Sequence, residues 1–412
     1  MALLVQKYGG TSVGSLERIR VVAQRIAAAR DQGHQVVAVV SAMAGETNRL
    51  FALGQSLEER PNPREMDALV STGEQVSSAL LSIALQTLKT PARSLIGHQL
   101  RLLTDGVFSK ARILAIDVRA LHQVLQAGQV PVVAGFQGLD EEGNITTLGR
   151  GGTDTTAVAV AAAIGADACE IYTDVEGVFT ADPNICKNAC KVARISYEEM
   201  LELASLGAKV LQIRSVEVAM KFGVPIHVRS SFTERDGTWV GAETRELESV
   251  VVAGVASDKN EVKLTIRSLP DEPGISAKIF KQLAQANVCV DMIIQNVSLQ
   301  GTTDLTFTAG KGDVAQARQL AISLAHQVGA GEVVVDSAVV KVSIVGLGMR
   351  SHAGVAARMF ELLAREGINI QAISTSEIKV SCLIHERYAE LAVRTLHDGF
   401  GLAEQAPARN GL

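Results

Sequence analysis

The chain has 412 residues, of which 47% are hydrophobic and 20% charged; this composition excludes a disordered chain and suggests two or three domains. Its formal net charge of -5 and the lack of a long run of Lys or Arg argue against nucleic acid as a partner. The longest run of small apolar residues, 157–164, is too short to cross a bilayer, and the N-terminal residues show no signal-peptide pattern. We therefore expect a cytoplasmic protein without a membrane partner.

The first 245 residues alternate apolar strands with amphipathic helices. We expect strands at 3–6, 35–41, 130–136, 168–173 and 225–230. We expect helices at 15–30, 74–88, 115–127, 154–164 and 207–222. Strands as continuously apolar as 36–40 indicate an α/β fold with a mainly parallel sheet covered by helices on both faces, which makes three layers. The polar segment 140–144 predicts a hairpin inside this domain.

The pattern changes near residue 240, and a repeat follows. Five positions recur with an offset of 80 residues: Gly274, Phe280, Leu283, Val288 and Ile293 match Gly354, Phe360, Leu363, Ile368 and Ile373. Each copy reads as a strand, a helix, a strand pair and a second helix, which predicts two small α+β units. The first copy closes with a strand at 332–335, whereas the second has no fourth strand of its own. We expect strand 249–256 to complete the second unit, so that the first unit is an insertion within it.

The first polar cluster is Lys7-Tyr8-Gly9-Gly10-Thr11-Ser12, between a strand and a helix. Glycines let the backbone approach an anion, the helix N-terminus supplies N–H donors, and Lys7 adds a full positive charge. A tight strand–helix turn with a solvated lysine explains the cluster equally well. The sequence lacks the P-loop signature and a complete dinucleotide fingerprint.

Two further clusters follow predicted strands, at the edge where parallel sheets bind ligands. Gly149 to Thr156 precedes an Ala- and Val-rich helix and combines Arg150, which can hold a carboxylate, with Asp154, which can hold an ammonium or orient a lysine. A helix N-cap with an incidental ion pair is the alternative. The segment 173–183 is rich in Asp, Gly and Pro, and it predicts a structured loop that either walls a nucleotide or lies plainly on the surface.

The cysteines indicate neither disulfides nor a metal site. Five cysteines in a chain of this length do not make a disulfide framework. Cys186 and Cys190 are four residues apart, but no histidine lies near them in the sequence, and the eight histidines are scattered. We expect free thiols in a loop and no protein-bound metal.

Four of these motifs together resemble aspartate kinases of the amino-acid kinase superfamily: K-Y-G-G-T-S, V-S-A-M with Thr47, G-R-G-G-T-D-T-T and T-D-V-E-G-V-F-T-A-D-P. The repeat resembles the paired βαββαβ ACT domains of the same enzymes, with Leu269 to Gly274 in one copy and Ile373 to Glu377 in the other. The resemblance covers almost the whole chain. It implies a kinase domain at 1–245, a first ACT domain at 262–337 and a second at 340–412.

The resemblance implies that ATP, with Mg²⁺ carried by its phosphates, phosphorylates the side-chain carboxylate of L-aspartate to 4-phospho-L-aspartate. The residues implied in catalysis are Lys7, Asp154 and Lys209. Those implied around ATP are Lys7, Tyr8, Gly9, Gly10, Ser41, Thr173, Asp174, Phe179, Thr180, Ala181, Asp182, Pro183 and Lys209. Those implied around aspartate are Thr47, Glu74, Arg150, Thr153 and Asp154. Tyr8 replaces a commoner Phe, and Thr153 replaces a commoner Ser while keeping the hydroxyl. Glu74 as a merely exposed residue at a helix start is the alternative for that position.

The ACT pair implies feedback control by lysine, threonine or both, and a homodimer or tetramer formed through these domains. The residues implied in effector binding are Asp271, Gly274, Ser276, Asp291, Gln295, Asn369, Ile370, Thr375 and Glu377. Two structural domains that only dimerise are the alternative. The rival functions are a kinase of glutamate or N-acetylglutamate, or an inactive amino-acid sensor; Lys7, Arg150 and Asp154 argue against the sensor.

Overall fold

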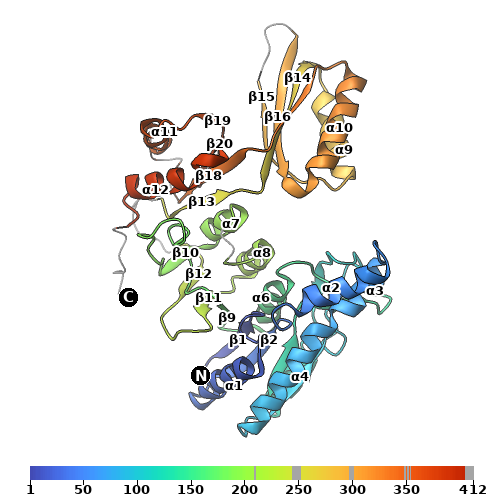
Figure 1. The fold of residues 1–412 in the computed structure, drawn as a ribbon. Helices are drawn as coiled ribbons and strands as arrows, with labels where there is room; N and C mark the ends of the chain where they lie inside the picture. The colour runs from blue at the N-terminus through green and yellow to red at the C-terminus, as the bar shows by residue number, and fades with distance from the viewer. Residues whose placement is uncertain are drawn as a thin grey trace.

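The computed structural model describes residues 1–207, 210–243, 252–296, 301–347, 349, 352 and 354–403. Figure 1 shows a large N-terminal domain at one end and two smaller α/β units at the other. The second of these units, which contains the C-terminal helix, lies next to the large domain, and the first unit lies beyond it.

The N-terminal domain is built on an eight-stranded sheet in the order β10-β12-β11-β9-β1-β2-β6-β3. Its strands are β1 (Leu3–Tyr8), β2 (Gln35–Val40), β3 (Ala92–Leu95), β6 (Val130–Ala134), β9 (Ala168–Thr173), β10 (Arg194–Ser196), β11 (Ile226–Ser230) and β12 (Thr238–Gly241). Neighbours pair in parallel, except β11 with β12. The chain passes from β1 to β2 on one side and returns to β9 on the other, so β1 and β9 flank the point where the strand order reverses.

Helices cover both faces of this sheet, which confirms the predicted three-layer fold. Helices α1 (Leu16–Asp31) and α4 (Thr72–Thr87) pack on one face. Helices α5 (Arg119–Gln126), α6 (Gly152–Ile164), α7 (Tyr197–Ser205) and α8 (Ile213–Phe222) contribute to the core on the other face. Buried strand residues on alternate faces feed the two cores: Val37 and Val39 point to one, Val36 and Ala38 to the other.

Several elements depart from the expected boundaries or were not expected. Helix α8 begins at Ile213 rather than at 207, because Gly207 has φ +95° and ends the preceding turn. Helices α2 (Glu46–Leu57) and α3 (Pro63–Val70) carry too short an apolar stripe to be found by periodicity; Leu50, Met66 and Val70 form their small cluster. The expected hairpin at 140–144 is present in a second sheet made of β5, β4, β7 and β8. Its strands are β4 (Leu103–Thr104), β5 (Ile113–Ala115), β7 (Gln137–Leu139) and β8 (Ile145–Thr147).

The helical stretch Pro63–Thr87 is long and apolar enough to span a membrane by length and composition, but half of its most apolar window is buried inside the protein. Within it, α4 packs against α1, β3 and β6 and buries Leu81 and Leu85. These contacts are typical of a core helix of a globular protein.

The C-terminal repeat folds into two similar four-stranded units. The first has the order β15-β16-β14-β17 and the second β13-β18-β20-β19. The strands are β13 (Gly254–Asp258), β14 (Glu261–Pro270), β15 (Val290–Gln295), β16 (Thr302–Gly310), β17 (Val333–Asp336), β18 (Val339–Val345), β19 (Ile370–Thr375) and β20 (Lys379–His385). The helices are α9 (Ile275–Gln285), η1 (Lys311–Asp313), α10 (Val314–Val328), α11 (Val355–Arg365), η2 (Glu386–Tyr388) and α12 (Ala389–Gly399). Gly274 and Gly354 occupy the same place, before the first helix of each unit, with φ +95° and +104°.

Strand β13 belongs to the second unit although it precedes the first in sequence. It pairs antiparallel with β18, from Gly254 opposite Val345 to Asp258 opposite Lys341. The first unit therefore lies between two neighbouring strands of the second. Residues 249–251 of the expected strand lie outside the described residues.

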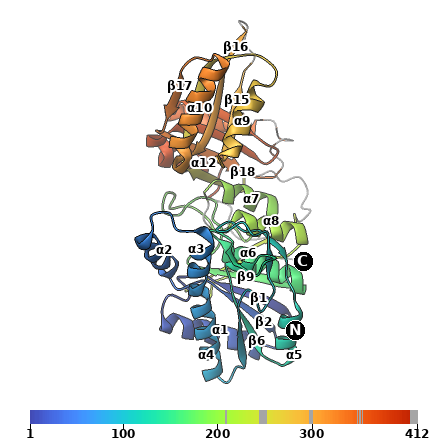
Figure 2. The same cartoon turned by 90° about the vertical axis from the view of Figure 1, so that its right-hand side faces the viewer.

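The second unit shares its core with the N-terminal domain. Ala181 and Cys186, from the segment between β9 and β10, belong to the apolar cluster of the second unit, and Val345 of the second unit belongs to that of the large domain. Helix α7 faces β13 and β18, as Figure 2 shows. Lys379 of β20 completes the contact with an ion pair to Glu202 of α7 at 2.8 Å.

Candidate active site

The loop after β1 forms a compact glycine-rich cradle that backbone hydrogen bonds hold in place. The N–H of Gly9 donates to the carbonyl of Tyr172 on β9 (3.2 Å), and the N–H of Ser12 donates back to the carbonyl of Gly9 (2.9 Å). A Cβ atom at Gly10 would lie 3.0 Å from the carbonyl oxygen of Ala42, so the loop depends on glycine there. Helix α1 then begins, capped by Ser15. Amides and a helix N-terminus at a strand end make a site for an anion.

Lys7 and Asp154 meet beside this cradle. Lys7 Nζ lies 2.6 Å from Asp154 Oδ1, and the two side chains are 10% and 13% exposed. Lys7 stands on β1, and Asp154 lies in the first turn of α6. The same turn approaches the sheet because Gly135 has no side chain: a Cβ there would lie 2.6 Å from Thr153 Cγ2. The expected pairing of a lysine with Asp154 is thus present, and Lys7 is not a solvated surface residue.

Glu74 is buried at the start of α4, so its interpretation as an exposed helix-start residue is wrong. It is 3% exposed, and its Oε1 accepts the N–H of Ala42 at 3.0 Å. Its Oε2 has no hydrogen-bond partner among the described residues. Burial raises the pKa of Glu74 to about 7, and the bond from Ala42 opposes this only in part. A buried, half-satisfied carboxyl group of this kind suits a cationic ligand. Thr47, five residues after Ala42 in the sequence, is partly buried on α2.

Tyr8 lies in the core and not at the surface of the cradle. Its ring is fully buried and stacks on Tyr172 at 4.9 Å, because the two residues are opposite one another in the β1–β9 pair. Its hydroxyl donates to Gln6 Oε1 at 3.0 Å. Burial, together with Tyr172, raises the pKa of Tyr8 well above the ordinary value. The Tyr8 side chain therefore has a packing role, and the nucleotide contact expected of Tyr8 would come from its backbone, whose carbonyl accepts the N–H of Ser41 at 3.0 Å.

Some residues of the segment after β9 make only local contacts, and others contact the second C-terminal unit. Thr173, at the strand end, donates to Asp174 Oδ1 at 3.1 Å, and Asp182 accepts the N–H of Asn184 at 2.8 Å. By contrast, the side chain of Thr180 bonds to His397 of α12, and Ala181 packs in the core of the second C-terminal unit. The side chains of Thr180 and Ala181 thus face the second unit, and the backbone N–H and carbonyl of Thr180 bond to Cys190 and Val255. Phe179 forms an isolated antiparallel β-bridge with Lys191, and Pro183 is exposed.

Arg150 is exposed in the turn before α6. Its carbonyl accepts the side-chain N–H of Gln212 at 2.9 Å, which ties this turn to the start of α8. Gly151, with φ +73°, leaves room for that glutamine: a Cβ would lie 2.6 Å from Gln212 Cγ. Lys209 lies outside the described residues.

Comparison with known proteins decides the family of this chain. The model of the amino acid kinase family matches residues 2–230, and an ACT domain model matches residues 342–400. The chain is 56% identical to the aspartate kinase Ask_LysC of Stutzerimonas stutzeri, over 100% of this chain and 99% of that protein. It belongs to the aspartate kinases of the amino acid kinase family. It is likewise 56% identical to the aspartokinase of Pseudomonas aeruginosa, over 100% of both chains.

Solved aspartate kinase structures share the fold. Aspartokinase III of E. coli in complex with aspartate and ADP, in the R-state, matches with a TM-score of 0.81 and 27% identity, over 97% of this chain and 100% of that one. The same enzyme in complex with lysine and aspartate, in the T-state, gives 0.74 and 27%, over 97% and 99%. The structure of this aspartate kinase is thus more similar to the R-state form.

Ser231 and Arg18 also lie at the cradle, although no sequence motif indicated them. Ser231 follows β11; its hydroxyl lies 2.5 Å from that of Ser12, and its carbonyl accepts Arg18 Nη2 at 2.8 Å. The strand at 225–230 was expected, and ligands of parallel sheets bind at the carboxyl ends of the strands, where the next residue lies. That rule, applied to every strand, would have found Ser231.

The expected effector residues of this aspartate kinase fall on the turns and edge strands of its two ACT-type units. Ser276 of α9 donates to Gln295 Oε1 of β15 at 2.8 Å, and the N–H of Asp271 donates to Gly301. Asp291 is instead ion-paired with Lys341 of the second unit. In the second unit, β19 begins at Ile370 and ends at Thr375. Asn369 precedes this strand, and Glu377 follows it.

Proposed function

We propose that this enzyme transfers the γ-phosphoryl group of ATP to the side-chain carboxylate of L-aspartate and yields 4-phospho-L-aspartate, the first step toward lysine, threonine and methionine. The observation that carries the proposal is the buried Lys7–Asp154 pair beside the Gly9-Gly10 cradle, at the strand-order reversal of the sheet. The aspartate- and ADP-bound relative supports ATP and aspartate as the two substrates.

The reaction joins two anions, and so the site must neutralise charge rather than supply a base. The attacking carboxylate is already ionised at neutral pH and needs no proton removed. Lys7, held in place by Asp154, follows the transferring phosphoryl group, and the N–H of Gly10 binds a phosphate oxygen, since that of Gly9 already donates to Tyr172. Lys209 is assigned to the nucleotide phosphates by the family resemblance. Positioning of this kind supplies most of the catalysis in phosphoryl transfer.

We assign Mg²⁺ to the nucleotide phosphates rather than to a cage of protein ligands. Mg²⁺ prefers oxygen ligands and keeps several waters, and carboxylate oxygens of Asp174 and Asp182 are available on the loop after β9. When bound, the ion would offset part of the negative charge of the phosphates. We also assign Ser41, Thr173 and Phe179 to the nucleotide.

We assign aspartate to the side chains on α2, at the start of α4 and around the start of α6 that the family motifs associate with it. Arg150 would hold the α-carboxylate in a bidentate contact, and Thr47 and Thr153 would donate hydroxyl bonds. Glu74 would bind the ammonium group. Its buried Oε2 lacks a hydrogen-bond partner in the described structure. A cation bound there would replace the hydrogen bonds to water that burial removed.

We further propose that lysine, threonine or both bind the ACT-type units and that these units join subunits into a homodimer or tetramer. The lysine-bound relative supports lysine as an effector. Strands β15 and β19 are edge strands, and Ile293 and Ile373, equivalent in the repeat, are 54% and 43% exposed there. An exposed strand edge with apolar side chains is a place for a second copy to pair. We assign the enzyme to the cytoplasm, which suits its five free cysteines.

The test is to incubate the enzyme with ATP, Mg²⁺, L-aspartate and hydroxylamine, which converts an acyl phosphate to a coloured hydroxamate. We expect aspartate hydroxamate, and no product when ATP is left out. Hydroxamate from glutamate or N-acetylglutamate but not from aspartate would replace the proposal with the rival kinase. No product from any of the three, with folded protein, would favour the sensor.

A further inference from the structure

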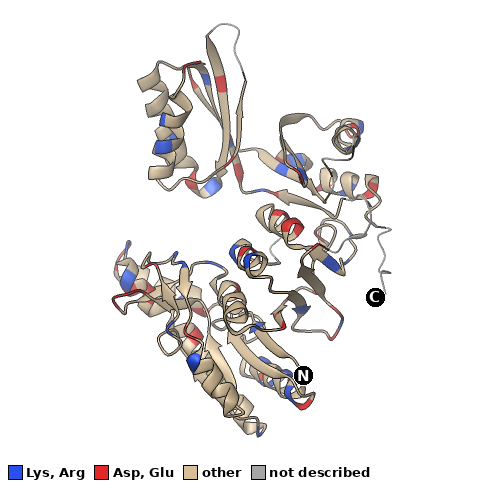
Figure 3. Ribbon diagram, turned by 180° about the vertical axis from the view of Figure 1, so that it is seen from behind, with Lys and Arg blue, Asp and Glu red and all other residues tan. Residues whose placement is uncertain are grey.

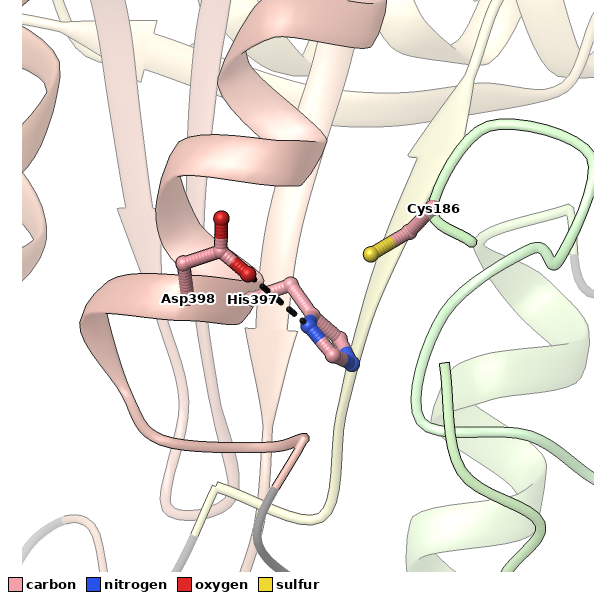
Figure 4. A group of neighbouring side chains, drawn as sticks. All are labelled: Cys186, His397 and Asp398. Carbon is pink, nitrogen blue, oxygen red and sulfur yellow. Dashed lines mark ion pairs between the residues drawn. The ribbon is translucent and has the colours of Figure 1, made fainter. Parts of the chain in front are cut away.

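Three metal-ligand side chains meet where the kinase domain contacts the second ACT-type unit. Cys186 comes from the segment between β9 and β10, and His397 and Asp398 come from the last turn of α12. Their ligand atoms all lie within 4.8 Å of one another, and His397 Nδ1 is 3.6 Å from Asp398 Oδ1. Figure 4 shows the Cys186 sulfur pointing from its loop toward the His397 ring, with the Asp398 carboxylate on the other side of that ring. Cys186 precedes the other two residues by more than 200 positions, so no spacing rule could have joined it to them.

His397 provides an independent sign that the cluster takes a ligand. The side chain is completely buried, and its Nδ1 makes no hydrogen bond within the described part of the chain. An unsatisfied buried polar atom costs about 1–3 kcal/mol, which a bound group would recover. The other ring nitrogen, Nε2, lies 2.9 Å from the hydroxyl oxygen of Thr180.

Thr180 can hold the ring in the state that a metal requires. Its hydroxyl oxygen accepts the N–H of Cys190 at 3.0 Å and has a second lone pair for Nε2–H of His397. With the proton on Nε2, the lone pair of Nδ1 faces Cys186 and Asp398. A histidine ligand whose second nitrogen donates to a neighbouring oxygen is the usual arrangement in metal sites.

We propose that Cys186, His397 and Asp398 bind a single divalent transition-metal ion of the Zn²⁺ class. Thiolate and imidazole ligands select such ions over Mg²⁺ and Ca²⁺, which prefer oxygen. Metal–ligand bonds of about 2.0–2.3 Å place tetrahedral ligands about 3.3–3.8 Å apart, so small side-chain rotations close the site. The Asp398 side chain is 63% exposed, which leaves the ion a route of entry and a water as its fourth ligand.

The ion would tie the regulatory unit to the segment that carries the proposed nucleotide residues. Thr180 already links the two parts twice: its carbonyl accepts the N–H of Val255 at 2.7 Å, and its hydroxyl meets His397. A bond from Cys186 to His397 through a metal would hold α12 on this segment. This consequence rests on the proposed function, whereas the metal site itself does not.

The test uses the full chain, stripped of metal with a chelator and titrated with Co²⁺ and Zn²⁺ in the absence of ATP and aspartate. We expect one equivalent to bind, and Co²⁺ to show the thiolate charge-transfer and intense visible bands of a tetrahedral site. Cys186→Ser should remove the charge-transfer band, and Asp398→Asn should weaken binding at least about tenfold. Cys289→Ser, at an exposed cysteine of the first unit, is the matched control and should bind like the wild type.

Zn²⁺ should also raise the thermal unfolding temperature of the wild type and of Cys289→Ser, but not that of Asp398→Asn. Asp398 is largely exposed, so this variant is expected to fold. A wild type that binds neither metal, or Cys186→Ser and Asp398→Asn variants that bind like the wild type, would overturn the proposal. Because no substrate is present, either result leaves the kinase assignment untouched.

Discussion

Among the described residues two lysines are buried, and they are paired differently. Lys7 of the kinase domain is 8% exposed and meets one carboxylate, Asp154. Lys341, at the junction of the two ACT-type units, is 3% exposed and meets Glu261 and Asp291. Lys7 also stands against a glycine, since a Cβ at Gly9 would lie 3.4 Å from its Nζ. A lysine with a single anion beside an open glycine loop retains attraction for a second anion, whereas one enclosed by two carboxylates is already neutralised.

Lys341 stays charged because two carboxylates enclose it. Burial alone would lower the pKa of Lys341, but the two carboxylates outweigh it and raise that pKa above its usual value. The ammonium therefore joins β18 of the second unit to β14 and β15 of the first. Since the second unit also packs on the kinase domain, the junction connects the first unit to that domain through packed side chains. The ionic groups of the chain in Figure 3 are otherwise interspersed along both parts of the molecule.

The largest expected effect comes from breaking the Lys341 junction. Lys341→Met leaves Glu261 buried without its cation, and we expect the free energy of unfolding to fall by about 3–5 kcal/mol. Urea denaturation followed by circular dichroism measures the change. Lys259→Met, at an exposed lysine between β13 and β14, is the control and should change stability by less than about 0.5 kcal/mol. Equal stability of the two variants would show that the Lys341 pairs contribute nothing net.

Lys7 should instead affect catalysis. Lys7→Ala removes the cation from the transferring phosphoryl group, and we expect kcat to fall by about 10²–10³-fold, equivalent to about 3–4 kcal/mol of barrier. The hydroxamate assay measures turnover, and circular dichroism checks that the variant is folded. Lys221→Ala, at an exposed lysine near the end of α8, should keep full activity. Near-normal turnover of Lys7→Ala would remove this residue from the mechanism and make the two lysines alike.

Glu74 extends the comparison to a buried carboxyl group without a cation. Its pKa of about 7 means that most of it is protonated at pH 6 and ionised at pH 8. We expect aspartate to bind about tenfold more weakly at pH 6 than at pH 8, because only the carboxylate attracts the ammonium group. The KM for aspartate across this range measures the effect, and Glu74→Gln should flatten the profile. A wild-type profile that stays level would place the ammonium elsewhere.

The same raised pKa gives the sign of the stability change. The folded protein holds the Glu74 proton more tightly than the unfolded chain does. The stabilisation by the neutral form is therefore complete below the ordinary pKa of glutamate and is lost as the pH rises through about 7.

The smallest effect is expected at the partly exposed pair of Lys379 and Glu202, which crosses the kinase–ACT interface at 2.8 Å. Because both side chains are about 20% exposed, solvent and salt screen the pair, and Lys379→Met should cost about 0.2–1 kcal/mol. Urea denaturation at low and high salt measures it, and the difference from wild type should shrink with salt. A loss as large as that of Lys341→Met would mean that position in the junction, and not burial, decides the value of these pairs.

The sequence alone determined much of the fold. Strand β9 covers the range predicted for it, 168–173, and the 80-residue repeat marks both ACT-type units, because residue pattern and duplication can be read from the sequence. It also placed Lys7, Glu74 and Asp154 in one site through the family motifs. Helices α2 and α3 were not predicted, since they bury few residues.

Only the tertiary structure decided which surroundings each side chain meets. It buried Tyr8 in the core, turned Thr180 toward α12, brought Ser231 to the cradle and set His397 beside Cys186. These outcomes depend on the register of neighbouring strands and on the docking of one domain on another. Such contacts join residues far apart in the chain, and no local pattern of residue types specifies them.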